Sequence, residues 1–99
     1  MKPVVESLGA TAELEQAVAY YEEREVGLGE RLYLAFREAR QFIRRNPEWG
    51  SPYSYGTRRW RVAGFPYKVI YLDAADEILI VAVAHDARRP GYWQPRLRD

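Results

Sequence analysis

The sequence predicts an α+β fold in which an N-terminal β-strand is followed by an antiparallel two-helix hairpin packed on an antiparallel β-sheet. In the first half of the chain, apolar residues recur at the spacing i, i+3, i+4 and i+7 of an amphipathic helix. In the second half, three closely spaced runs are rich in valine, isoleucine and aromatic residues, which is typical of strands joined by tight hairpins. Helices followed by successive strands favour an α+β arrangement. The 99 residues suit one domain over residues 1–99.

The first half predicts a short strand and two helices. Residues 3–8, PVVESL, favour an edge strand because proline is tolerated where a strand starts. The segment TAELEQAVAYYEERE predicts an amphipathic helix with Thr11 as its N-cap. The two glycines of EVGLGE interrupt it, and a second helix is expected from about Glu30 to Arg45, where an Asn-Pro pair stops it. The short linker predicts that the two helices pack antiparallel.

The second half predicts a loop, three strands and a tail that closes the core. NPEWGSPYSYGT is rich in proline and glycine and indicates a loop, and the runs TRRWRVA, PYKVIYLD and EILIVAVA indicate strands. The last run is apolar on both faces, so we expect it to lie centrally, with helices on one side and another cover on the other. After the Pro-Gly turn, Tyr92 and Trp93 are expected to divide, one ring closing the core and the other lying along the surface.

Composition and charge limit the function. The chain has no cysteine and a single histidine, His85, which excludes disulfides and argues against a metal site; we expect no cofactor. No apolar run approaches the ~20 residues of a membrane span, and the N-terminus lacks the apolar core of a signal peptide, so a cytoplasmic protein is expected. Residues 1–26 are acidic and residues 27–99 are basic. This polarity indicates an anionic partner for one surface.

The order of elements resembles that of the RelE/ParE superfamily of toxins from bacterial type II toxin–antitoxin modules, including ParE-like plasmid stabilisation proteins. The resemblance covers nearly the whole chain and rests on the segments ELEQAVAYYEE, IRRNPEWGSP, RRWRVAGFPYKVIY and VAVAHDARRPGYWQPR. It implies a toxin neutralised by a cognate antitoxin, whose disordered C-terminal segment folds over the toxin, and it leaves open a homodimer or a toxin–antitoxin hetero-oligomer. The long helical hairpin is similar to ParE members, which inhibit DNA gyrase. The polar tail is similar to RelE members, which cut mRNA on the ribosome.

A nuclease of this family would need a base, an acid and cations on the phosphate. The resemblance makes Arg61, Arg88 and Tyr92 the nearest matches to RelE-type site residues. Arginines stand where RelE strands carry lysines, and because arginine is a poor proton acceptor, His85 would serve as the base. The alternative is that His85 is a satisfied residue at a strand end, bonded to a backbone carbonyl or to Asp86.

The remaining candidates belong to a binding surface for the antitoxin or the target. Three arginines recur on the second helix opposite its apolar face, although a solvated face partly paired with Glu30 and Glu38 explains them as well. Alternation in RRWRVA places two arginines on one strand face, which cannot be the core face. Of the tandem tyrosines, one should be exposed. The tail arginines either stack on the aromatic rings, pair with Asp73 and Asp86, or contact a phosphate or partner. The candidate binding residues are Tyr20, Arg37, Arg40, Arg44, Arg59, Arg61, Arg88 and Arg96.

Overall fold

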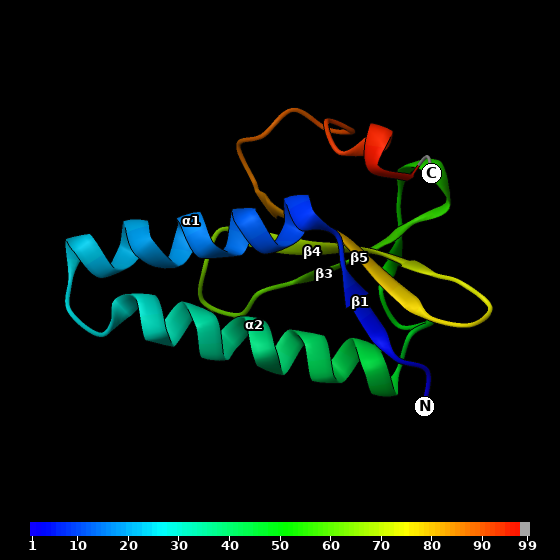
Figure 1. Ribbon diagram of the computed structural model, residues 1–99, viewed down its shortest axis with the longest axis horizontal. Helices are drawn as coiled ribbons and strands as arrows, with labels where there is room; N and C mark the ends of the chain where they lie inside the picture. The colour runs from blue at the N-terminus through cyan, green and yellow to red at the C-terminus, as the bar shows by residue number, and fades with distance from the viewer. Residues whose placement is uncertain (98–99) are drawn as a thin grey trace.

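The computed structural model describes residues 1–97. Its elements are β1 (Val4–Glu6), α1 (Leu8–Arg24), α2 (Leu28–Arg45), β2 (Ser51–Pro52), a 3-10 turn at Ser54–Gly56, β3 (Arg58–Arg61), β4 (Tyr67–Asp73), β5 (Ile78–His85) and a 3-10 turn at Gln94–Leu97. The predicted β-α-α-β-β-β order is confirmed, with the two-residue β2 added inside the predicted loop. Figure 1 shows the helices side by side and antiparallel, and the C-terminal segment returning past the start of α1. Neither helix is long and apolar enough, within the described part of the chain, to cross a membrane.

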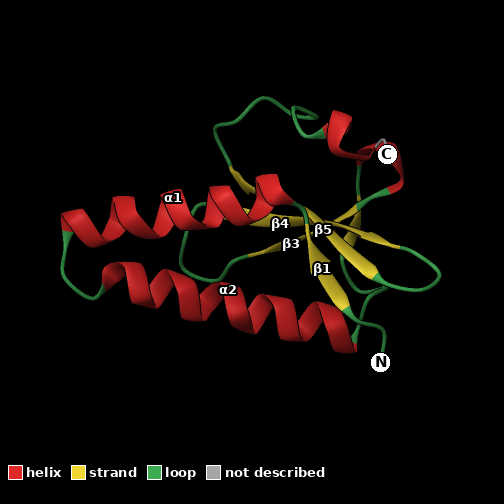
Figure 2. Cartoon of the chain, viewed as in Figure 1, coloured by secondary structure: helices red, strands yellow, loops and turns green. Residues whose placement is uncertain are grey.

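The sheet is mixed, whereas the sequence predicted an antiparallel one. Its strand order is β1-β5-β4-β3-β2, and the β1–β5 pair is parallel, with Val4 opposite Ile78. The other strand pairs are antiparallel, and Figure 2 shows the strands together beside the two helices. A parallel pair cannot be closed by a tight hairpin and needs a long connection. A three-residue strand carries no sequence signal for its direction, so the prediction was wrong for this pair.

Helix α1 begins earlier than predicted, because Ser7 and not Thr11 caps it. The Ser7 hydroxyl accepts a hydrogen bond from the Ala10 N–H at 3.0 Å, while Thr11 donates to Glu6. Ser7 also ends β1, since its N–H donates to the Ile80 carbonyl at 2.9 Å. The strand therefore passes into the helix at a single residue, which fixes α1 against the edge of β5.

Helix α2 begins at Leu28, so Gly29 lies inside it and does not interrupt the helical region as predicted. Gly27 caps the helix with a φ of 91°, in the left-handed region that favours glycine. At Gly29 the reason for glycine is close packing, because a Cβ there would lie 2.5 Å from the Val18 carbonyl oxygen of α1. The Glu22 carboxylate accepts the N–H groups of both glycines at 2.9 and 3.0 Å and closes the hairpin.

The sheet has a core on each face, as predicted from the apolar β5. On one face the helices pack through residues such as Leu14, Phe36 and Ile43 against Val69 and Ile80. On the other face the C-terminal segment packs on the sheet, and the main buried residues there are Ile70, Val81, Ala82, Ala84 and Trp93. Trp93 is 1% exposed and Tyr92 is half-buried, so the expected division of the two rings is confirmed.

Candidate binding surface on the sheet

Three cations gather on the sheet face that the helices do not cover. In the β3–β4 register Arg59 lies opposite Ile70 and Arg61 opposite Lys68, and Ile70 belongs to the core beneath Trp93. Arg59, Arg61 and Lys68 line a hollow of about 620 Å³, and we call these three residues the basic face. The expectation that the two arginines of RRWRVA share a non-core face is met, because both are exposed while Val62 is buried.

The basic face is only partly neutralised. The Arg61 guanidinium binds the Asp86 carboxylate at 2.6 and 3.3 Å, and Lys68 lies 3.7 Å from the same group. The hydrogen bond from Arg61 lowers the pKa of Asp86, so this carboxylate is charged at neutral pH. The Arg59 guanidinium stacks on the Tyr53 ring at 4.4 Å. Three cations share one carboxylate among the groups described here, which leaves the surface positive and suited to an anionic partner.

His85 lies on the opposite face of the sheet. Its ring packs at 5.1 Å edge-on against Tyr67, which contacts the helix-side core, and its Nδ1 accepts the Ala87 N–H at 2.9 Å. A β-bulge in β5 produces this placement. Tyr71 is opposite Ile80 and Ile70 is opposite Ala82, so one residue of β5 is extra and the alternation of faces changes phase there. Without the bulge, His85 would share a face with Arg61.

Tyr92 and Arg96 hold the C-terminal segment against α1. The Tyr92 hydroxyl donates to the Glu13 carboxylate, and burial together with this bond raises the pKa of Tyr92. Arg96 donates to both oxygens of Glu13 at 3.0 and 3.1 Å and to the Val81 carbonyl at 3.0 Å. The Arg88 guanidinium lies 3.8 Å above the Tyr92 ring and is exposed. Glu13 and Arg96 neutralise each other, whereas the Arg88 guanidinium is exposed and can contact a partner.

Glu13 is the residue that the sequence did not single out. In the predicted helix beginning at Thr11 it stands in the first turn, where an acidic residue has an ordinary explanation in the helix dipole, whereas α1 begins at Leu8 and has no acidic residue in its first turn. Its carboxylate also accepts the Val83 N–H at 3.0 Å, on the edge of β5 beyond the end of β1. Nothing in the local sequence distinguishes it from Glu15, which is exposed two residues later.

The helix arginines do not form one uniform stripe. Arg40 is half-buried and bonds the Glu6 carboxylate at 3.2 Å and the Val4 carbonyl at 3.0 Å, so it fixes β1 to α2. Arg44 is half-buried as well, and Arg37 is exposed. The expected pairing with Glu30 and Glu38 is replaced, for Arg40, by the pairing with Glu6.

The tandem tyrosines divide as expected. Tyr20 is 49% exposed, with the Arg24 guanidinium 4.4 Å over its ring. Tyr21 packs edge-on against Phe65 at 5.3 Å and against Tyr67 at 6.4 Å. Tyr20 is therefore open on the surface of α1, while Tyr21 belongs to the helix-side core.

The sequence matches the model of a toxin family, and the fold matches a chain from a toxin–antitoxin system. The family model described as the ParE toxin of the type II toxin–antitoxin system parDE matches residues 5–90. The chain belongs to the ParE toxin family. A solved structure titled as the chromosomal ParDE TA system from P. aeruginosa is 18% identical, covers 86% of this chain and 96% of its own, and superimposes with a TM-score of 0.66. At that identity the likeness shows the fold of this ParE-family chain. No curated protein sequence matches it.

Proposed function

We propose that this ParE-family chain is a toxin that a cognate antitoxin neutralises and that acts by binding and inhibiting DNA gyrase, without bond-making chemistry of its own. Family membership supports the toxin assignment. The observation that carries the choice of mechanism is the separation of His85 from the basic face. A binding inhibitor needs only a surface, whereas a nuclease needs its base and its cations around one phosphate.

The residues around the basic face favour binding over RNA cleavage. Asp86, the carboxylate in contact with it, is held in its ionised form by Arg61 and has a lowered pKa, which makes it a weak base. Tyr92 commits its hydroxyl proton to Glu13, and its pKa is raised. His85 faces the helix side with one ring nitrogen already bonded to the Ala87 N–H. The predicted set of Arg61, His85, Arg88 and Tyr92 is therefore distributed over two faces and the tail.

Two assays on the purified protein test this proposal. Gyrase supercoiling of relaxed plasmid should fall as the protein is titrated in, and mRNA bound to ribosomes should remain intact at the same concentrations. His85→Gln should inhibit gyrase as well as the wild type, because the side chain has no part in the proposed contact. Cleaved mRNA from the wild type, reduced about 100-fold or more by His85→Gln, would establish the nuclease alternative instead.

A further inference from the structure

Tyr53 contacts two of the three cations of the basic face. The Arg59 guanidinium lies 4.4 Å from the centroid of its ring, and the Lys68 ammonium lies 6.0 Å from the same centroid. The face of an aromatic ring attracts cations, so one ring holds two like charges near each other. Tyr53 is half-buried and is not among the residues that line the hollow, so it acts on the two cations from beside it.

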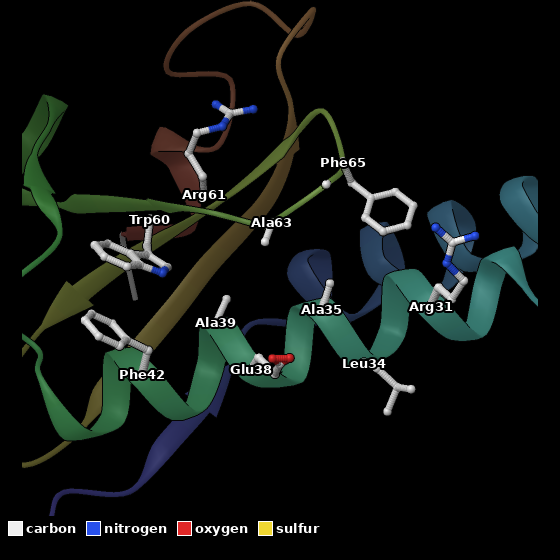
Figure 3. Close-up of a pocket in the computed structure, with 11 residues that line it drawn as sticks. Arg31, Leu34, Ala35, Glu38, Ala39, Phe42, Trp60, Arg61, Ala63 and Phe65 are labelled. Atoms are coloured by element: carbon white, nitrogen blue, oxygen red, sulfur yellow. The ribbon is translucent and has the colours of Figure 1, made fainter.

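The third cation has an anchor of its own. Figure 3 shows the Arg61 side chain pointing away from α2, whereas Trp60 points toward that helix. Arg61 binds the Asp86 carboxylate at 2.6 and 3.3 Å. Arg59 makes no ion pair with a carboxylate in the part of the chain that the structure describes. The position of the Arg59 guanidinium therefore depends on the Tyr53 ring.

The Tyr53 ring is held in turn by the C-terminal segment. Its centroid lies 6.1 Å from that of Trp93, which is 1% exposed. Tyr55, two residues later, packs edge-on against the same indole at 5.9 Å. The main chain of this loop is closed by the Tyr53 N–H, which donates to the Thr57 carbonyl at 2.8 Å. Both tyrosines of the loop thus rest on Trp93, but only Tyr53 reaches the cations.

These contacts form a continuous path from α1 to the basic face. Glu13 of α1 binds Tyr92 and Arg96, the flanking residues carry Trp93, and Trp93 supports Tyr53. Coupling between distant groups is carried by such chains of packed side chains. The spacing of the cations on β3 and β4 therefore depends on the docking of a segment that lies outside the hollow.

We propose that Tyr53 is a positioning residue for the basic face, whose ring, held by Trp93, keeps Arg59 and Lys68 at the spacing where both contact one carboxylate of a protein partner. The proposal rests on the proposed function, which gives the chain protein partners. Trp60 and Ala63 line the same hollow, and their apolar surface suits the methylene groups of a glutamate. When the segment undocks, the ring is released and affinity for the carboxylate falls.

An acidic peptide tests the role of the ring without gyrase or antitoxin. Hexaglutamate is titrated into the purified protein at low ionic strength, and the nuclear magnetic resonance signal of the Arg59 Nε–H reports binding. Tyr53→Leu should weaken binding about fivefold, because both cation–ring contacts are lost. Tyr53→Phe keeps the ring and should bind within about twofold of the wild type. Equal affinity of the leucine and phenylalanine variants, or no binding by the wild type, would overturn the proposal.

Tyr55→Leu is the matched control for a purely structural effect. It removes a ring that packs on Trp93 from the same loop, yet the ring contacts neither of the two cations. We expect Tyr55→Leu to bind hexaglutamate within about twofold of the wild type. If Tyr55→Leu weakens binding as much as Tyr53→Leu does, the effect belongs to the packing of the loop and Tyr53 has no positioning role.

The link to the C-terminal segment has a reciprocal test. Binding that requires the docked segment must also oppose its opening, by the same factor. The Arg96 amide, bonded to the Trp93 carbonyl at 2.9 Å, should exchange about fivefold more slowly in saturating hexaglutamate. The Asn46 amide at the end of α2 should keep its rate, and Tyr53→Leu should abolish the slowing at Arg96. An unchanged Arg96 rate in the saturated wild type would refute the link through Trp93.

The two proposals fail separately. If the peptide affinities follow the Tyr53 ring but the wild type affects neither gyrase nor an antitoxin, the positioning role holds and the proposed function is lost. If gyrase is inhibited but the variants bind the peptide equally, the reverse is true. Binding of hexathymidylate that depends on the Tyr53 ring, with no binding of hexaglutamate, would replace the carboxylate by a phosphate and contradict the proposal.

Discussion

At the scale of single residues, the contacts of Glu13 are with partners that lie 70 to 83 positions away in the sequence. Its carboxylate joins the Val83 N–H of β5, the Tyr92 hydroxyl and the Arg96 guanidinium. Val83 lies on an edge of β5 that β1, ending at Glu6, does not cover. The side chain therefore supplies there the acceptor that a longer β1 would have supplied.

Arg96→Ala should lower the free energy of unfolding by about 2 kcal/mol, because hydrogen bonds to a charged, largely buried partner are lost. Arg88→Ala is the matched control. It removes an exposed guanidinium stacked on the same segment, and we expect a change of less than about 1 kcal/mol. Urea denaturation of the three proteins measures both effects. Equal losses would mean that the Arg96–Glu13 pair does not hold the segment. The sequence grouped the two arginines as partner contacts, and this pair of variants separates their roles.

Tyr92→Phe should lower stability at neutral pH by about 1–2 kcal/mol, since the hydrogen bond to Glu13 is lost. The pKa of Tyr92 is raised in the folded protein. Its contribution is therefore complete below about pH 10, the ordinary tyrosine pKa, and is lost as the pH rises toward the raised value. The difference in unfolding free energy between wild type and Tyr92→Phe should be constant up to about pH 10 and should narrow from there to about pH 11.5, measured by urea denaturation. A constant difference over that range would contradict the assignment.

At the scale of elements, the segment after β5 acts as the cover of the second sheet face. Trp93 packs on Val81, Ala82 and Ala84, and Tyr55 packs edge-on against its ring at 5.9 Å. Tyr55 has a φ of 61°, an uncommon conformation for a residue other than glycine. The segment is thus held from both sides, by α1 through Glu13 and by the loop before β3.

Truncation after Pro90 should lower the free energy of unfolding by about 3 kcal/mol or more, the scale of losing a large buried aromatic side chain. Trp93→Ala should account for most of that loss. Arg89→Ala, in the exposed turn of the same segment, should change stability by less than about 0.5 kcal/mol. Thermal melting with circular dichroism measures all three. If the truncated protein melts at the wild-type temperature, the segment is an arm and does not close the core.

At the scale of the whole molecule, the exposed arginines are divided between the sheet and the helices. The basic face lies over β3 and β4 away from the helices, and the exposed Arg37 and Tyr20 lie on the helices themselves. Arg40 is committed to β1 and Arg96 to α1. A partner that reaches the sheet therefore meets positive charge first on β3.

Arg59→Glu combined with Arg61→Glu should weaken antitoxin binding at physiological salt, because like charges then meet. Arg24→Glu combined with Arg89→Glu changes the net charge equally outside the basic face and should leave the affinity within about threefold. Both doubles replace exposed arginines, so the fold should survive in each. Titration of labelled antitoxin measures the two affinities. Equal weakening would assign the effect to net charge and remove the basic face as the contact.

The sequence by itself determined the element order, the two helices and the strands β3, β4 and β5. It also determined that one ring of the Tyr92–Trp93 pair is buried in the core and the other lies along the surface. These depend on local periodicity, which is set by the backbone of each element. Tertiary structure alone decided the parallel β1–β5 pair, the partners of Glu13 and the face on which His85 lies. One extra residue in β5 turns His85 from the face of Arg61 to the face of Tyr67. A bulge is a property of two paired strands, so a pattern along one strand does not contain it.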